Sequence, residues 1–331
     1  MKIFVTRKIP ESGIQLLRKY HTVKVYSKDT VIPRKDLLQG VRWADALLCL
    51  LTDKIDKTII NANPKLKVIS NYAVGYDNID VKYATTKKIP VTNTPGVLTD
   101  AVAEHTIALL MSVARRIPES DTFTKKKKYK GWEPMLFLGT QLKGKTLGII
   151  GSGRIGAGVA ERAVRGMGMN VMYSDIKRNI PFEKKYKAKY APITRILKNA
   201  DFVSLHVPLL PSTRHLIGKK EFNMMKKTAY LINTSRGPVI DEKALVSALR
   251  TKRIAGAALD VFEFEPKLVK GLEKLDNVIL TPHTASATIE TRSAMSDIAA
   301  QNIITILQKK KAKFTVNTEV YGGYKNGKEI F

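Results

Sequence analysis

Short β-rich runs alternate with amphipathic segments along most of this chain, and that alternation limits the folds it can adopt. In the N-terminal part, strands are predicted at residues 3–6, 23–26, 46–50 and 67–70. Between them, residues 12–20, 34–41 and 56–61 carry apolar side chains at helical spacing. Such alternation is typical of βαβ units, whose strands form a parallel sheet.

A second series of the same kind follows a long predicted helix at about residues 98–116 and a polar, lysine-rich loop. Its strands are expected near residues 146–150, 170–174, 201–206, 228–234, 254–260 and 277–281. A last helix is predicted at about 287–309. We therefore predict two α/β domains, one formed by residues 1–98 with 287–331 and the other, residues 99–286, inserted into it.

A glycine-rich turn marks the start of the second series. It reads Gly151-Ser152-Gly153-Arg154-Ile155-Gly156, directly after an apolar strand and at the start of a helical pattern. Gly151 permits a tight turn, Gly153 lets the backbone approach a pyrophosphate, and Gly156 lets the helix pack closely on the strand. The helix N-terminus, which includes Arg154 and Ile155, attracts phosphate charge. This context predicts a Rossmann domain that binds a dinucleotide.

The next predicted strand ends at Asp175. A carboxylate at this point accepts hydrogen bonds from the adenosine ribose hydroxyls and repels a 2′-phosphate, which favours NAD over NADP. Lys177 and Arg178 follow directly and would soften the repulsion, so NADP remains the less favoured cofactor. The alternative reading of Asp175 is an ordinary turn residue after a strand.

Three later segments place reactive side chains just after predicted strands: Arg236, Glu265 and His283. In open α/β sheets the ligand crevice lies beyond the carboxyl ends of the strands, so these side chains are expected to converge. Histidine is the usual general base, a carboxylate can orient it, and arginine offers bidentate donors to a substrate carboxylate. The set suits hydride transfer between a nicotinamide and a 2-hydroxy acid.

With these motifs in this order, the chain resembles the D-isomer-specific 2-hydroxyacid dehydrogenases over essentially its whole length. Within that family it is most similar to archaeal glyoxylate/hydroxypyruvate reductases. Residues 71–80 and 91–100 carry further matching motifs, NYAVGYDNID and VTNTPGVLTD. The resemblance implies a Rossmann NAD-binding domain inserted into a flavodoxin-like substrate-binding domain, with parallel sheets in both.

The resemblance also implies roles for individual residues. Arg236 would bind substrate, His283 would be the acid/base next to the cofactor, and Glu265 would pair with His283. Asp260 would contact the nicotinamide end. The remaining expected cofactor contacts are Val207, Pro208, Thr213, Thr234 and Ser235, and the expected substrate contacts are Leu51 and the backbone amides of Val74 and Gly75. The helix at 98–116 would help to form a homodimer.

Departures from relatives narrow the expected substrate. Relatives that oxidise phosphoglycerate tend to carry arginines where this chain has Leu50 and Asn71, neither of which suits a buried phosphate. Formate-oxidising relatives replace Glu265 with an amide. We therefore expect NADH-dependent reduction of a small 2-oxo acid, glyoxylate or hydroxypyruvate, to the D-2-hydroxy acid. The alternatives are a D-3-phosphoglycerate dehydrogenase and, in another class, an NAD-binding corepressor.

The formal net charge of +28 is the feature that this reading does not explain. Its densest clusters, such as residues 125–128 and 309–311, lack interleaved aromatic residues, so solvated surface lysine is expected and no specific nucleic-acid partner. No metal-ligand spacing is present, so no metal is predicted. No apolar stretch reaches the roughly 18 residues that a membrane span needs, and the chain opens as a strand, so a cytoplasmic location is expected.

Overall fold

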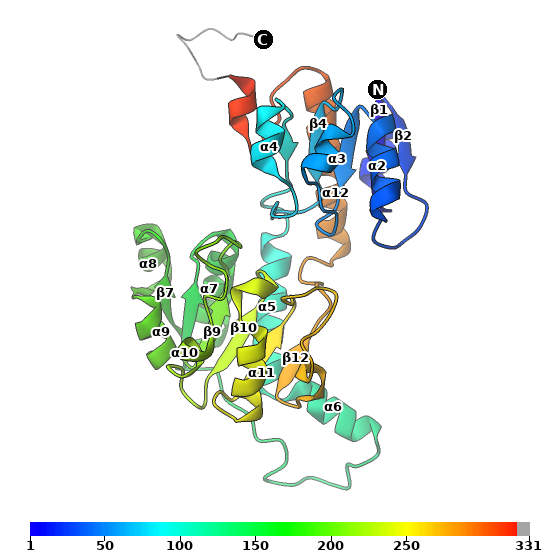
Figure 1. Cartoon of the computed structure of the whole chain (residues 1–331). Helices are drawn as coiled ribbons and strands as arrows, with labels where there is room; N and C mark the ends of the chain where they lie inside the picture. The colour runs from blue at the N-terminus through cyan, green and yellow to red at the C-terminus, as the bar shows by residue number, and fades with distance from the viewer. Residues whose placement is uncertain (323–331) are drawn as a thin grey trace. The chain divides into compact units, whose positions relative to one another are not determined.

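The computed structural model describes residues 1–322, and the chain divides into two compact units (Figure 1). Unit 1 contains Met1–Leu98 and the chain from Ala287 onward. Unit 2 contains Thr99–Ser286. Each unit is built around its own parallel β-sheet, as the alternating sequence pattern predicts.

The sheet of unit 1 has the strand order β2-β1-β3-β4-β5, with every pairing parallel. This is the order of flavodoxin-like doubly wound sheets. Its strands are β1 (Lys2–Val5), β2 (Thr22–Val25), β3 (Ala46–Cys49), β4 (Val68–Asn71) and β5 (Val91–Thr92). Its helices are α1 (Glu11–Arg18), α2 (Arg34–Trp43), α3 (Lys57–Asn61), α4 (Val81–Thr86) and α12 (Ile289–Leu307).

Helix α12 packs against the elements at the start of the chain. A Cβ atom built on Gly13 of α1 would lie 2.3 Å from the carbonyl oxygen of Ser296, so the two helices touch backbone to backbone at this point. The Ser70 hydroxyl of β4 donates to the carbonyl of Ala299 at 3.1 Å. The last long helix is therefore part of the core of unit 1.

The sheet of unit 2 has the order β12-β11-β10-β9-β6-β7-β8, again with parallel pairings throughout. Counted from β6, this is the Rossmann order 3-2-1-4-5-6 with one more strand beside the sixth. The strands are β6 (Thr146–Ile150), β7 (Asn170–Ser174), β8 (Lys189–Tyr190), β9 (Phe202–Leu205), β10 (Tyr230–Asn233), β11 (Gly256–Leu259) and β12 (Val278–Leu280). The helices are α5 (Thr99–Ala114), α6 (Ile117–Lys125), α7 (Arg154–Met167), α8 (Ile180–Tyr186), α9 (Ile193–Asn199), α10 (Lys219–Phe222) and α11 (Glu242–Arg250).

Helices cover both faces of this sheet, and successive side chains along each strand point to opposite faces. On β10, Leu231 packs into a cluster with residues of α9 and α11, whereas Ile232 packs into a cluster with residues of α5 and α7. Both side chains are fully buried. The continuous apolar runs in the sequence reflect this double covering.

The structure corrects the predicted helix at 98–116 and the loop after it. Helix α5 ends at Ala114, Arg116 is left-handed with φ +54°, and α6 begins at Ile117, where a loop was predicted. Pro118 lies in the first turn of α6, a position that proline favours. Met111 of α5 is 44 % exposed, although the residues around it are largely apolar.

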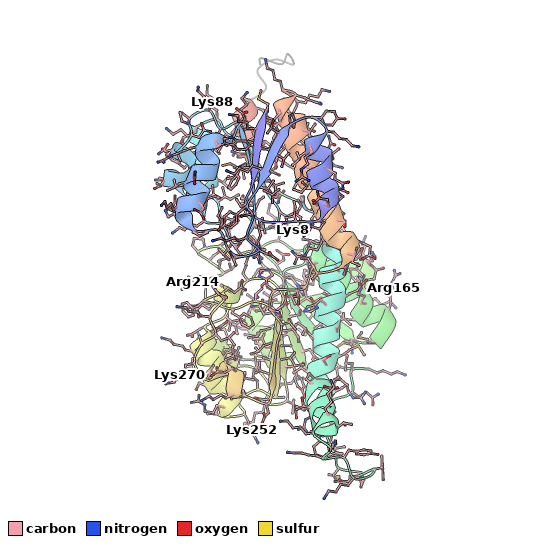
Figure 2. The ribbon with its side chains drawn as sticks, turned by 90° about the vertical axis from the view of Figure 1, so that its right-hand side faces the viewer. Lys8, Lys88, Arg165, Arg214, Lys252 and Lys270 are labelled. Atoms are coloured by element: carbon pink, nitrogen blue, oxygen red, sulfur yellow. The ribbon has the colours of Figure 1, made fainter. Side chains whose placement is uncertain are left out.

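Basic side chains lie on both units. Figure 2 labels Lys8 and Lys88 on unit 1 and Arg165, Lys252 and Lys270 at separate places on unit 2. Within residues 1–322, no helix combines the length and the apolarity that a membrane span requires.

Candidate active site

The glycine turn of unit 2 has the geometry that its sequence predicts. Gly151 has φ +101°, and a Cβ there would lie 2.7 Å from the carbonyl oxygen of His206. A Cβ on Gly156 would lie 2.1 Å from the carbonyl oxygen of Gly151, so α7 packs directly on the turn. By contrast, a Cβ on Gly153 meets no chain atom within 4 Å. Gly151 and Gly156 are thus needed for packing, whereas Gly153 leaves the backbone at the N-terminus of α7 accessible to a ligand.

That N-terminus suits a diphosphate. Gly153 caps α7, so the amides of Arg154, Ile155 and Gly156 belong to the first turn, whose N–H groups have no acceptor within the helix. The helix dipole adds positive potential at the same place. Arg154 is exposed and Ile155 is partly buried. The residues present therefore fit the pyrophosphate of a dinucleotide.

Asp175 lies directly after β7 and is held beside the glycine turn. Its Oδ2 accepts hydrogen bonds from the amide and the hydroxyl of Ser152, each at 2.7 Å. Partial burial acts to raise the pKa of Asp175, but the hydrogen bonds from Ser152 and the Ile176 amide outweigh it and the pKa is lowered. The carboxylate is therefore fixed and ionised at neutral pH.

The remaining candidates of unit 2 follow the carboxyl ends of its other strands. Because these strands are parallel, all of their carboxyl ends lie at the same edge of the sheet. Val207 and Pro208 follow β9, Thr234, Ser235 and Arg236 follow β10, Asp260 and Glu265 follow β11, and His283 follows β12. The chain order reverses between β6 and β9, which is the switch point where doubly wound sheets bind ligands.

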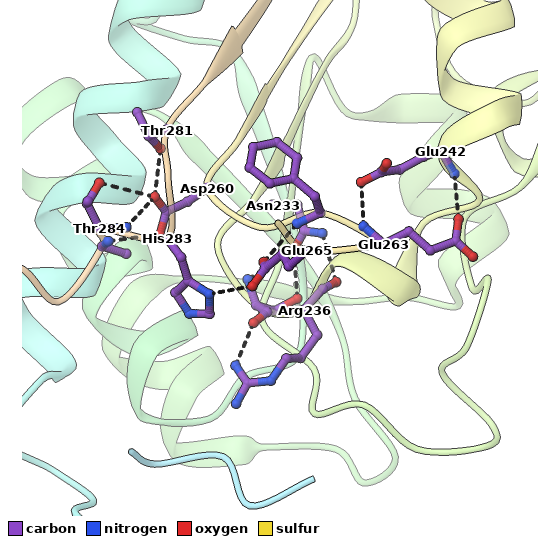
Figure 3. A network of polar contacts seen from close by, with 12 residues as sticks. Asn233, Arg236, Glu242, Asp260, Glu263, Glu265, Thr281, His283 and Thr284 are labelled. Atoms are coloured by element: carbon purple, nitrogen blue, oxygen red, sulfur yellow. Dashed lines mark hydrogen bonds and ion pairs between the residues drawn. The ribbon is translucent and has the colours of Figure 1, made fainter. Parts of the chain in front are cut away.

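His283 and Glu265 form a direct pair, drawn in Figure 3. The imidazole Nδ1 lies 3.0 Å from Oε2 of Glu265, and both side chains are about one-third exposed, 27 % and 32 %. The other carboxylate oxygen, Oε1, accepts the Phe262 amide at 2.9 Å. A carboxylate at Nδ1 orients the ring and leaves Nε2 for the reacting proton.

Asp260 builds the loop that carries His283. Its side chain is fully buried, and its Oδ1 accepts the Thr281 hydroxyl at 2.7 Å and the Thr284 amide at 2.8 Å. Oδ2 accepts the Ala285 amide at 2.8 Å. His283 itself is left-handed, with φ +55°, a conformation that costs a non-glycine residue about 1 kcal/mol and persists where the surroundings fix it. Both oxygens of the Asp260 carboxylate thus accept hydrogen bonds from the loop that carries His283.

Arg236 lies in an extended backbone segment that is pressed against the loop containing Glu265. The next residue, Gly237, has no room for a side chain, since a Cβ there would lie 1.9 Å from the carbonyl carbon and oxygen of Phe262. The Arg236 carbonyl accepts the amide of Asn233, and its Nη1 donates to the Ser235 carbonyl at 2.8 Å. Backbone packing thus joins the arginine segment to the Glu265 segment.

Three of the other predicted cofactor residues form hydrogen bonds through their hydroxyl groups. Thr213 donates to the Pro208 carbonyl at 2.6 Å and accepts the Leu210 amide, which closes the turn after Val207. The Thr234 hydroxyl pairs with that of Thr106 on α5 at 2.8 Å. Ser235 donates to the side-chain oxygen of Asn233.

The predicted substrate residues other than Arg236 lie in unit 1. Leu51 follows β3, and Val74 and Gly75 follow the neighbouring strand β4, so all three are at the carboxyl edge of that sheet. Asn71 donates to the Gly75 carbonyl at 2.8 Å, and Asn78 donates to the Leu50 carbonyl at 3.0 Å. These amides hold the two loops against each other.

Sequence reasoning missed two groups of supporting residues. His105 of α5 lies 3.2 Å from the Thr281 hydroxyl and 3.4 Å from Oδ1 of Asp260. Glu242 and Glu263 form a buried carboxylate pair near Glu265. Neither stands out in the sequence, since Glu242 is flanked by Asp241 and Lys243, and His105 directly follows Glu104. Among the described residues, no cluster of three or more His, Cys, Asp or Glu could hold a metal ion.

Unit 2 combines a Rossmann sheet and a glycine turn with a carboxylate after the second strand, at the position that binds ribose in dinucleotide-binding domains. With the His–Glu pair at the same edge, these features define a class, the nicotinamide-dinucleotide-dependent oxidoreductases. Residues 107–285 match the family model for the NAD binding domain of D-isomer specific 2-hydroxyacid dehydrogenases. The chain belongs to this family and is an NAD(P)-dependent oxidoreductase.

Relatives that match over 96 % of the chain support the same family. The chain is 49 % identical over 323 residues to a glyoxylate reductase of Thermococcus litoralis, covering 96 % of this chain and 97 % of the relative. It is 48 % identical over 321 residues to a glyoxylate reductase of Korarchaeum cryptofilum, covering 96 % of each. A solved NADPH-dependent glyoxylate/hydroxypyruvate reductase from Sinorhizobium meliloti, in complex with NADP and malonate, has a TM-score of 0.84 and 30 % identity over 96 % of each chain. The recognition of the family from sequence is confirmed.

Proposed function

We propose that this protein reduces glyoxylate or hydroxypyruvate to the corresponding D-2-hydroxy acid with NADH, which unit 2 binds. The observation that carries the proposal is the His283–Glu265 pair, with Nδ1 and Oε2 3.0 Å apart, at the same sheet edge as the glycine turn. An acid/base group beside a dinucleotide site is the minimum that carbonyl reduction requires.

The chain's own residues supply the proton. Bound NADH supplies the hydride. His283 is protonated before reaction and donates from Nε2 to the substrate carbonyl oxygen, since Nδ1 faces Glu265. The Glu265 carboxylate stabilises the imidazolium and keeps the ring oriented as the proton leaves. The reverse reaction uses the same nitrogen as a base.

Arg236 binds the substrate carboxylate in this proposal. A guanidinium offers paired N–H donors to a carboxylate. The malonate in the complex of the Sinorhizobium relative is itself a small dicarboxylate, which supports a small-acid site.

Two features of unit 1 argue for an unphosphorylated substrate. Asn71 is fully buried, and its amide nitrogen already donates to the carbonyl of Gly75 and to Oδ1 of Asn78. Leu50 offers no side-chain donor. Neither residue supplies a cation for phosphate, so phosphoglycerate-type substrates are disfavoured.

We propose NAD(H) over NADP(H) for a related reason. The ionised Asp175 would repel a 2′-phosphate. Arg178, which follows closely, is bound in a two-pronged ion pair to Glu183, with both contacts at 2.8 Å. It is therefore engaged elsewhere and does little to relieve that repulsion.

We also propose that the chain forms a homodimer. The segment after α5 exposes large apolar side chains that a lone molecule would leave in water: Ile117 at 54 %, Trp132 at 82 %, Met135 at 75 % and Leu138 at 59 %. Sedimentation equilibrium of the native chain and of Trp132→Glu with Met135→Glu would show a dimer and a monomer respectively.

The test of function is a substrate panel with NADH and NADPH. We expect the largest kcat/KM with glyoxylate or hydroxypyruvate, and a much smaller value with 3-phosphohydroxypyruvate. Arg236→Ala should lower kcat/KM by about a hundredfold or more, and Arg236→Lys should recover only part, because lysine lacks the planar fork. Equal kcat/KM for the native enzyme and Arg236→Ala would refute the role of Arg236.

A further inference from the structure

Glu242 is a buried carboxylate that the proposed mechanism does not use. It is the first residue of α11, its exposure is 1 %, and one of its oxygens, Oε2, has no hydrogen-bond partner among the described residues. A buried, partly unsatisfied carboxyl is costly, and such a group in a native structure needs an explanation. Its neighbour Glu263 is nearly as buried, with 4 % of its side chain exposed.

The two glutamates form a reciprocal pair, drawn at the right of Figure 3. The amide of Glu263 donates to Oε1 of Glu242 at 2.6 Å, and the amide of Glu242 donates to Oε2 of Glu263 at 3.3 Å. The second oxygen of Glu263, Oε1, pairs with Nε2 of His215 at 2.6 Å and lies 3.4 Å from Nη2 of Arg214. Each carboxylate therefore holds the backbone of the other segment.

This pair is connected to both halves of the proposed site. Glu263 follows Phe262, whose amide donates to Glu265 and whose carbonyl is pressed against Gly237. Gly237 in turn follows Arg236. A shift of the Glu263 amide would move Phe262 and thereby Glu265 and the arginine segment.

The electrostatics of Glu242 determine the pH range in which its carboxyl group is ionised. Burial raises the pKa of Glu242 to about 6, contacts with the backbone amides of Glu263 and Val269 act to lower it, and the negative charges of Glu263 and Glu265 add to the rise. Above that pH the carboxylate is ionised, and its bond to the amide is charge-assisted. The Arg214 guanidinium offsets the charge of Glu263 from the other side, where the His215 ring also contacts this carboxylate.

We propose that Glu242 is a positioning residue: through its bond to the Glu263 amide it fixes the loop that aims Glu265 at His283 and packs against the Arg236 segment. This inference rests on the proposed function of His283, Glu265 and Arg236. Glu242 itself contacts neither substrate nor cofactor.

The test compares three variants at Glu242. Glu242→Gln keeps an oxygen acceptor at the right length and should retain kcat within about threefold, because a neutral amide oxygen still accepts the Glu263 amide. Glu242→Asp keeps the charge but is one methylene short, and Glu242→Ala removes the acceptor. Both should lower kcat by about tenfold to a hundredfold with little change in the Kd of NADH, since misplacement of about 1 Å costs up to about a hundredfold.

The control is Glu221→Ala, which removes a carboxylate that accepts the Gly218 amide at the start of α10 and takes no part in the Glu242–Glu263 pair. It should lose stability without losing kcat. A folded Glu242→Ala with native kcat would overturn the proposal. If Glu242→Ala does not fold, the kcat values of the other two variants decide. An active Glu242→Asp together with an inactive Glu242→Gln would also overturn the proposal.

A readout without turnover separates this proposal from the function it rests on. The ¹⁵N shift of the His283 imidazole, assigned with His283→Asn, reports the bond to Glu265. We expect Glu242→Ala to change that shift and Glu242→Gln to leave it. Absence of turnover in the native chain with every 2-oxo acid would refute the function alone, whereas an unchanged shift in Glu242→Ala would refute the positioning role alone.

Discussion

Substitution of Gly153 by alanine should separate cofactor binding from folding. A Cβ at this position meets no atom of the chain within 4 Å, and the backbone angle φ of −69° suits alanine. The only expected cost to folding is the weaker N-cap, roughly 0.5–1 kcal/mol. The methyl group would, however, stand where the pyrophosphate must approach the first turn of α7.

The expected loss follows from the bonds at that turn. Displacing the pyrophosphate weakens one or two charge-assisted hydrogen bonds, each worth about 1.5–3 kcal/mol. The Kd of NADH should therefore rise by about tenfold to a hundredfold or more, since 1.4 kcal/mol corresponds to roughly a factor of ten. Fluorescence titration with NADH measures the Kd, and urea unfolding measures the stability.

Gly166 of the same helix provides the matched control. A Cβ there also meets nothing within 4 Å, so Gly166→Ala adds the same methyl group at the far end of α7. It should leave the Kd of NADH unchanged and raise stability by roughly 0.5 kcal/mol or more. A folded Gly153→Ala that binds NADH as tightly as Gly166→Ala would refute our assignment of the glycine turn.

Three further outcomes are expected. Gly156→Ala should weaken both folding and NADH binding, since its Cβ would lie 2.1 Å from the Gly151 carbonyl oxygen; a stable variant would contradict this close packing of α7 on the turn. Asp175→Ser should raise the ratio of kcat/KM for NADPH to that for NADH by at least about tenfold, and an unchanged ratio would count against Asp175 as the selective residue. Stability should also depend on pH in two opposite ways. Burial lowers the pKa of His206 to about 4, so its contribution, about 3 kcal/mol, is present above pH 6.5 and lost as the pH falls towards 4. The raised pKa of Glu242, about 6, gives a contribution of about 2 kcal/mol that is present below pH 4.5 and lost as the pH rises through 6. Urea unfolding of Glu242→Gln should show a gain over the native chain at pH 7.5 that vanishes near pH 4.5, and a pH-independent difference would contradict this.

The features that sequence predicts well are those set by local backbone chemistry. The strand–glycine–helix motif predicts a tight turn correctly, because Gly151 has a positive φ and Gly156 lies against the backbone of Gly151. The alternating pattern likewise predicts parallel sheets, and the structure and its relatives confirm that fold class. Side chains that follow successive strands of such a sheet must share an edge, so the convergence of Glu265 and His283 was predictable.

What escaped prediction depends on contacts between segments distant in sequence. Strands β5 and β8 have two residues each, too few for a periodic pattern. Helix α6 follows a left-handed Arg116, which is held by an ion pair to Glu119 that composition does not reveal. The Glu242–Glu263 pair joins residues 21 positions apart through backbone amides, and no spacing rule anticipates it.

The central claim is that His283 gives its proton to a 2-oxo acid while NADH is oxidised, and single-turnover kinetics of His283→Asn tests it most directly. NADH bound to the variant is mixed with excess glyoxylate, and the decay of nicotinamide absorbance is followed. We predict a rate lowered by about 10²–10⁴-fold with NADH still bound. Oxidation of NADH at a near-native rate by this variant would contradict it.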